Sequence, residues 1–132
     1  MLDRYMNQFS QELEMQDSIT SPEVGHYLLQ FDNEVNLEVF QTSEGNYVFK
    51  GVIGACPTQR PGEFLAKIMQ ANLFGRGTRE ASIGLNEQEN VLTLSLEVGY
   101  NLPYHEWKNR IEDAISVINY WRKEAENYQQ MS

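Results

Sequence analysis

The sequence has little cysteine, no long apolar run and no excess of positive charge. Its single cysteine, Cys56, excludes an internal disulfide and favours a reducing compartment. No apolar stretch approaches the roughly 20 residues that a membrane span needs. The N-terminal stretch 1–16 is amphipathic and carries acids, which argues against a secretory signal. These absences predict a cytoplasmic protein without a membrane span.

Negative charge predominates, with 10 basic against 19 acidic residues and a net charge of −9. An acidic surface argues against nucleic acid and anionic membranes as main partners, because both are negatively charged. The distribution is uneven: residues 1–45 hold one basic and nine acidic residues, whereas residues 46–79 hold five basic and one acidic. The basic middle is either a solvated helix edge or a site for an acidic partner segment.

Side chains that commonly carry chemistry are few and scattered. His26 and His105 lie far apart in the sequence, and neither has partners at a metal-ligand spacing. Cys56 precedes a proline without a nearby histidine, so a buried apolar role is favoured over a nucleophile. The stretch "GRGT" lacks the spacing and the lysine of a phosphate-binding loop. We therefore expect no catalytic residue, no metal and no cofactor, and we expect that the protein is not an enzyme.

The first half of the chain predicts a helix and then three strands. Apolar residues at spacings of four, three and four indicate a helix from about Leu2 to Met15. "QDSITSPEVG" reads as a polar connector, and Asp32 with Asn33 as a turn. "HYLLQF", "EVNLEVF" and "YVFKGVIGAC" read as strands, the second by its alternation of apolar and polar residues and the third by its β-branched and aromatic content.

The second half predicts a helix, two strands and a final helix. The helix should begin near Pro61 and end near Gly75. "EASIGL" and "VLTLSLEV" read as strands, and Asn101 with Pro103 opens the last helix. Its apolar stripe is Trp107, Ile111, Ile115, Ile118 and Trp121, and a polar tail that we expect to fray follows from about residue 123. The order α-β-β-β-α-β-β-α predicts one α+β domain over residues 1–132 with a mostly antiparallel five-stranded sheet.

The middle helix carries more apolar side chains than one sheet face can cover. One stripe holds Phe64, Ile68 and Ala71, and another holds Leu65, Met69 and Leu73. Either the helix is sandwiched within its own chain, or it is shared with a second subunit around a two-fold axis. The apolar face of the first helix raises the same question, because exposed apolar patches on small proteins usually mark protein-binding sites.

Three stretches in a fixed order carry a resemblance to a known family. They are "VFKGVIGACP", then "FLAKIMQANLFGRGTREASIGLNEQENVLTLSLEV", then a long last helix ending in "NYWRKEAE". With the small size and acidity, this order resembles the class I chaperones of bacterial type III secretion, the Tir chaperone family. The resemblance implies a dimer, either a homodimer or a heterodimer with a second small chaperone. It also implies that the dimer binds an extended N-terminal segment of a secreted effector or gatekeeper protein and keeps it competent for secretion.

The resemblance also assigns site residues. The dimer interface would draw on the middle helix and the strand after it, with Ile68, Met69, Leu73, Phe74, Ile83 and Leu85. Client binding would draw on the first helix and the early strands, with Leu2, Met6, Phe9, Leu29, Phe31, Val35, Leu37 and Val39.

Two other functions remain open from the sequence. The protein could be a transcription regulator that binds RNA polymerase or a sigma factor, alone or as a second role of a chaperone. Its acidic N-terminal third could compete for a basic surface there. It could instead be a small-molecule-binding or enzymatic dimer, which would need a pocket with convergent polar groups that the sequence does not indicate.

Overall fold

The computed structural model describes residues 2–13, 19–31, 35–74, 81–86, 88 and 90–130, with the backbone alone at residues 22, 73 and 74. It confirms the α+β class. The three helices are α1 (Leu2–Leu13), α2 (Pro61–Phe74) and α3 (Tyr104–Gln130). The six strands are β1 (Ile19–Glu23), β2 (His26–Gln30), β3 (Asn36–Gln41), β4 (Tyr47–Ala55), β5 (Ser82–Asn86) and β6 (Val91–Val98).

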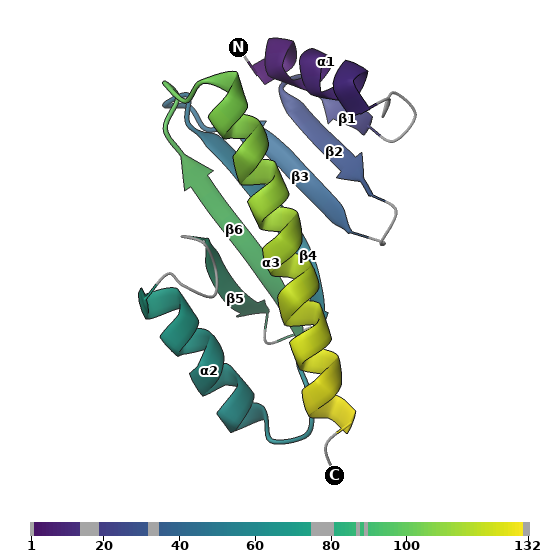
Figure 1. The fold of residues 1–132 in the computed structure, drawn as a ribbon, viewed down its shortest axis with the longest axis vertical. Helices are drawn as coiled ribbons and strands as arrows, with labels where there is room; N and C mark the ends of the chain where they lie inside the picture. The colour runs from purple at the N-terminus through teal and green to yellow at the C-terminus, as the bar shows by residue number, and fades with distance from the viewer. Residues whose placement is uncertain are drawn as a thin grey trace.

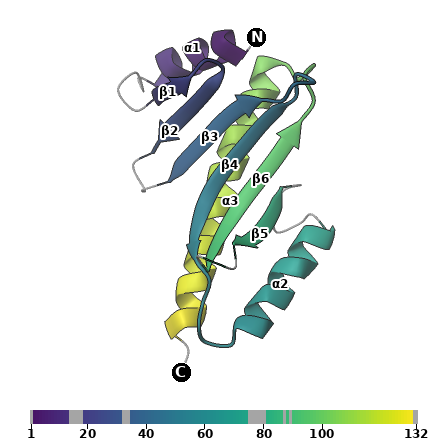
Figure 2. The same cartoon turned by 180° about the vertical axis from the view of Figure 1, so that it is seen from behind.

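The strands form one sheet in the order β1-β2-β3-β4-β6-β5, with every neighbouring pair antiparallel. Helices α1 and α3 lie on the same face of this sheet, α1 over its first strands and α3 along β4 and β6 (Figure 1). Seen from behind, the strands lie in front of α3 and none of the described helices covers them, while α2 lies beyond the β5 edge (Figure 2). The sheet therefore has one covered face and one open face.

The prediction of five strands was wrong by one, because β1 forms within the stretch that we interpreted as a connector. Its Ile19 pairs with Leu29 of β2, and Gly25 turns the chain between the two strands at a φ of 77°. A proline in the stretch argued against a strand, yet proline is tolerated in an edge strand, which is where β1 lies. The turn predicted at residues 32–33 and the helix end predicted at residue 75 lie outside the described residues.

The polar C-terminal stretch does not fray as expected, since α3 continues to Gln130. Ala125 is 6% exposed, and the ring of Tyr128 lies 5.1 Å from that of Phe64 on α2. The small and aromatic residues in this polar stretch recur on the face that meets α2 and β4. That face, rather than the composition of the stretch, decides that the helix continues.

Aromatic side chains fill the core between α1, α3 and the sheet. The buried indole of Trp107 has the rings of Tyr5, Phe9, Tyr47 and Phe49 around it, with centroids 5.4–6.5 Å away. Tyr5 also donates its hydroxyl hydrogen to the carbonyl of Leu102, at 2.7 Å. Aromatic pairs at such distances stabilise a core beyond the area that they bury. This cluster fixes α1 to the start of α3.

Candidate protein-interaction surfaces

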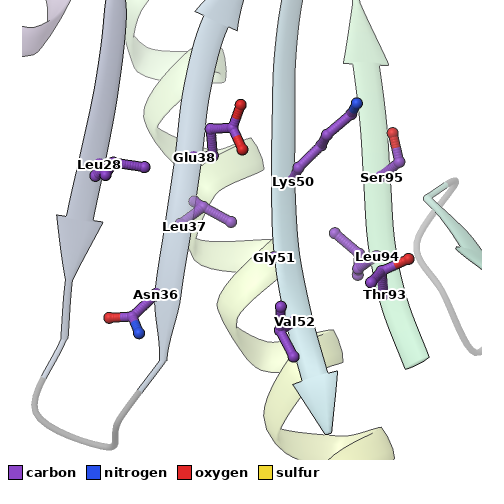
Figure 3. A pocket seen from close by; sticks show the side chains of 10 residues that line it. All are labelled: Leu28, Asn36, Leu37, Glu38, Lys50, Gly51, Val52, Thr93, Leu94 and Ser95. Atoms are coloured by element: carbon purple, nitrogen blue, oxygen red, sulfur yellow. The ribbon is translucent and has the colours of Figure 1, made fainter. Parts of the chain in front are cut away.

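The open sheet face holds a groove of about 590 Å³ across β2, β3, β4 and β6. Figure 3 shows the side chains around it; they are Leu28, Asn36, Leu37, Glu38, Lys50, Gly51, Val52, Thr93, Leu94 and Ser95. Two of them are apolar side chains that water reaches, Leu28 at 40% and Val52 at 52% exposure. Exposed apolar side chains on a hollowed sheet face are typical of a surface that binds another polypeptide.

Charged side chains border this groove on the side of β2 and β3. Glu38 accepts a hydrogen bond from His26, whose other ring nitrogen lies 3.6 Å from a carboxylate oxygen of Glu23. The His26 ring stacks on the ring of Phe40 at 4.8 Å, and the ammonium of Lys50 lies 5.5 Å from the centroid of the Phe40 ring. These contacts hold the side chains of Glu38 and Lys50 against His26 and Phe40. The groove therefore offers both signs of charge beside two exposed apolar side chains.

Helix α2 offers a second apolar surface. Phe64 and Ile68 are buried, but Met69 on the next turn is 69% exposed and lies with Ala66 and Gln70 around a shallow hollow. A large apolar side chain left in water on a helix is a candidate contact for a partner. The second apolar stripe predicted for this helix therefore meets no covering element at Met69.

The residues expected to bind a client are mostly covered by their own chain. Seven of the eight are buried: Leu2, Met6, Phe9, Leu29, Val35, Leu37 and Val39 are at most 2% exposed, and Phe31 is half-buried. These seven belong to the hydrophobic core, which answers the question raised by the first helix: its face with Leu2, Met6 and Phe9 is covered within the chain. The periodicity of Leu2, Met6 and Phe9 correctly marked one helix face but could not tell whether that face meets its own sheet or a partner. Whether a client contacts any of the eight stays a prediction.

The residues expected in a dimer interface divide into two groups. Ile68 and Ile83 are 4% and 6% exposed within one chain, and Leu85 is half-buried. Met69 is exposed, and the side chains of Leu73 and Phe74 lie outside the described set. Their role at an interface stays a prediction, and Met69 is the member whose side chain is open to a partner.

The sequence reasoning missed Leu28 and Val52. Leu28 follows Tyr27 and precedes Leu29 in an apolar run, which hides the alternation of the strand. Its partner across β3 is the polar Glu38, and this pairing places Leu28 on the open face. Val52 lies on the same face as Lys50, two residues before it. Alternation counted from Lys50 could have identified Val52 from the sequence.

Two ionisable groups outside these surfaces, Cys56 and Tyr27, have raised pKa values. Cys56 is buried, and burial raises the pKa of its thiol, which lowers its reactivity. Burial and a hydrogen bond to Asp3 raise the pKa of Tyr27 to about 12. Among the residues that the structure describes, no three His, Cys, Asp or Glu side chains gather as metal ligands would. None of the described helices has the length and apolar character to cross a membrane.

The fold and its two open apolar surfaces define a small α+β protein suited to binding other polypeptides. The sequence pattern of the Tir chaperone protein (CesT) family matches residues 4–122. The chain belongs to that family, as the resemblance in sequence predicted.

The chain is also similar to known proteins in sequence and in fold. A protein of Chlamydia pneumoniae is 22% identical over 122 residues, covering 92% of this chain and 93% of that one. The ExsC–ExsE complex contains a chain with a TM-score of 0.73 at 13% identity, covering 94% of this chain and 92% of its own. The HopA1–SchA chaperone–effector complex contains one with a TM-score of 0.68 at 17% identity, covering 92% and 93%. At such identities these structures show a shared fold.

Proposed function

We propose that this protein is a type III secretion chaperone that binds the N-terminal segment of a secreted effector or gatekeeper protein. The family match over residues 4–122 carries the proposal. The HopA1–SchA structure supports it, because that structure is a chaperone–effector complex with the same fold. Binding holds the client segment extended and competent for secretion in the bacterial cytoplasm. Such a role needs neither catalysis nor a cofactor.

The open sheet face is suited to an extended client segment. Apolar client side chains would bury Leu28 and Val52, at roughly 25 cal/mol per Å² of apolar surface removed from water. Ordering the client offsets part of this gain. Lys50 and Glu38 at the rim would select the polar residues that flank those apolar anchors.

The exposed side of α2 is suited to a second subunit, either another copy of this chain or a second small chaperone. Burying Met69 against a partner would remove a large exposed apolar side chain of this helix from water. A dimer through α2 leaves the open sheet face of each subunit free for client. It also explains why a helix at the margin of the sheet carries two apolar stripes.

The test is affinity purification of the tagged chain from its native cells, with mass spectrometry of the bound proteins and light scattering of the purified complex. We expect one secreted protein to dominate and the chain to be dimeric. The double variant Leu28→Asp, Val52→Asp should lose the secreted protein and remain dimeric. Met69→Asp should instead yield monomers, because it places a charge in the proposed subunit contact.

Val24→Asp is the matched control, because Val24 is 99% exposed and lies outside both surfaces. It should keep both the client and the dimer. Polymerase subunits in place of a secreted protein would favour the transcription regulator over the chaperone. Retention of the client by the double variant would move its binding site away from the open sheet face.

A further inference from the structure

Strand β5 forms one edge of the sheet and β1 forms the other. An edge strand presents unpaired backbone N–H and C=O groups, which are a template for pairing with another strand. A protein that handles extended polypeptides would have two such edges to control. The hydrogen bonds at β5 show how one of them is controlled.

The side chain of Asn72 on α2 forms hydrogen bonds with both backbone groups of Ile83. Its Oδ1 accepts a hydrogen bond from the N–H of Ile83 at 2.9 Å, and its Nδ2 donates one to the carbonyl oxygen of Ile83 at 3.0 Å. In an antiparallel strand the N–H and C=O of one residue point to the same side. Both groups of Ile83 therefore point away from β6 and toward α2. The carboxamide takes the place that a peptide group of an added strand would take.

The position of Asn72 is fixed by contacts of residues that precede it in α2. The ring of Phe64 packs edge-on against Trp121 at 5.9 Å, and the ammonium of Lys67 bonds to a carboxylate oxygen of Glu124 at 2.9 Å. Figure 1 shows α2 lying alongside β5, beyond the edge of the sheet. An added strand would have to displace the Asn72 carboxamide from Ile83.

A similar arrangement protects the end of β4. Pairing between β3 and β4 ends at Leu37 and Gly51, so β4 continues past its neighbour. Arg122 of α3 donates hydrogen bonds to the carbonyls of Val52 and Ile53, at 3.1 and 2.7 Å. Helix side chains thus satisfy open backbone groups at two places on the sheet. At β1, among the described residues, the side-chain bonds come from Ser21 within its own hairpin.

We propose that Asn72 closes the β5 edge to strand addition, so that β1 is the edge of the described sheet that stays available to an extended client segment. The closure of β5 follows from the geometry of the free chain. That a client segment uses the β1 edge rests on the proposed function. A side chain with both a donor and an acceptor at this distance is required, because the two groups of Ile83 need one of each.

The experiment compares the wild-type chain with Asn72→Leu and Asn72→Ala, which lack both hydrogen-bonding groups. Asn7→Leu is the matched control, because Asn7 is an exposed amide on α1 and lies outside both candidate surfaces. Hydrogen exchange of the Ile83 amide should accelerate about fivefold to tenfold in both Asn72 variants, as expected for the loss of one hydrogen bond. It should not change in the control. Unchanged exchange in both Asn72 variants would overturn the proposal.

A peptide copy of residues 91–98 with a photo-crosslinking group then serves as a strand probe, because β6 is the natural antiparallel partner of β5. It should crosslink to residues 82–86 in the Asn72 variants and not in the wild type or the control. Crosslinking to residues 82–86 of the wild type would show that the edge is open and overturn the proposal. Both readouts use the free chain, so they stand or fall separately from the identification of a client.

Discussion

Helices α1 and α2 have similar lengths, 12 and 14 residues, and both carry apolar residues on more than one turn. They differ in how far the rest of the chain buries them. Helix α1 buries Leu2, Tyr5, Met6 and Phe9 against the sheet and α3. Helix α2 lies at the margin, where Phe64 and Ile68 are buried and Met69 is in water. The comparison teaches that α1 completes the core of one chain, while α2 leaves the apolar side chain of Met69 exposed.

Replacing Phe9 tests the first half of this comparison and has the largest expected effect. Phe9 is 1% exposed and packs edge-on against Trp107 at 5.8 Å. Phe9→Ala should lower the free energy of unfolding by about 3–5 kcal/mol, because it leaves a cavity beneath α1. Urea denaturation followed by tryptophan fluorescence measures it.

Leu13→Ala is the control on the same helix, because Leu13 is 45% exposed. It should change the free energy of unfolding by less than about 0.5 kcal/mol. A stability loss no greater for Phe9→Ala than for Leu13→Ala would show that α1 is not part of the core.

Two glycines sharpen the comparison between the packed and the marginal regions. A Cβ at Gly51 would lie 2.5 Å from Cδ1 of the buried Ile118, whereas a Cβ at Gly62 near the start of α2 would meet nothing within 4 Å. Gly51→Ala should destabilise the chain by about 1–3 kcal/mol through overpacking. Gly62→Ala should stabilise it by about 0.5 kcal/mol, because it restricts the unfolded chain. Thermal unfolding of the two variants measures both, and effects of the same sign would contradict the comparison.

The pH dependence of α1 docking is the smallest effect. A hydrogen bond from Lys108 lowers the pKa of the Glu12 carboxyl below its ordinary 4.5, and Tyr104 also donates to this carboxylate. A lowered folded pKa contributes stability above the unfolded pKa, which is lost as the pH falls through the folded value. The stability advantage of wild type over Glu12→Gln should therefore be present at pH 7 and shrink below about pH 4.5. An advantage that stays constant between pH 7 and pH 3 would refute this account.

Local patterns in the sequence predicted most of the elements. The alternation in "VLTLSLEV" identified β6 and its buried face, Leu92, Leu94 and Leu96. Proline at position 61 marked the start of α2, and the stripe from Trp107 to Trp121 marked the buried side of α3. These signals are local, because a periodic arrangement of apolar residues favours one element whatever surrounds it.

The candidate site was less accessible to sequence reasoning. Burial of Leu2, Met6 and Phe9 depends on which surface meets the helix face, and the polar β1 depends on pairing with β2. Leu28 and Val52 are exposed only because no described helix covers that sheet face. Alternation can assign Val52 to a sheet face, but whether another segment covers that face is not encoded within a window of neighbouring residues.

The sequence by itself determined the class of the fold, the faces of its main helices and strands, and the family. Only the tertiary structure decided which apolar face closes on its own chain and which stays open. It also brought Asn72 to the backbone of Ile83, 11 residues later in the chain. The physical reason is that hydrophobic periodicity specifies a face to be covered, whereas the identity of the cover is set by contacts between distant segments.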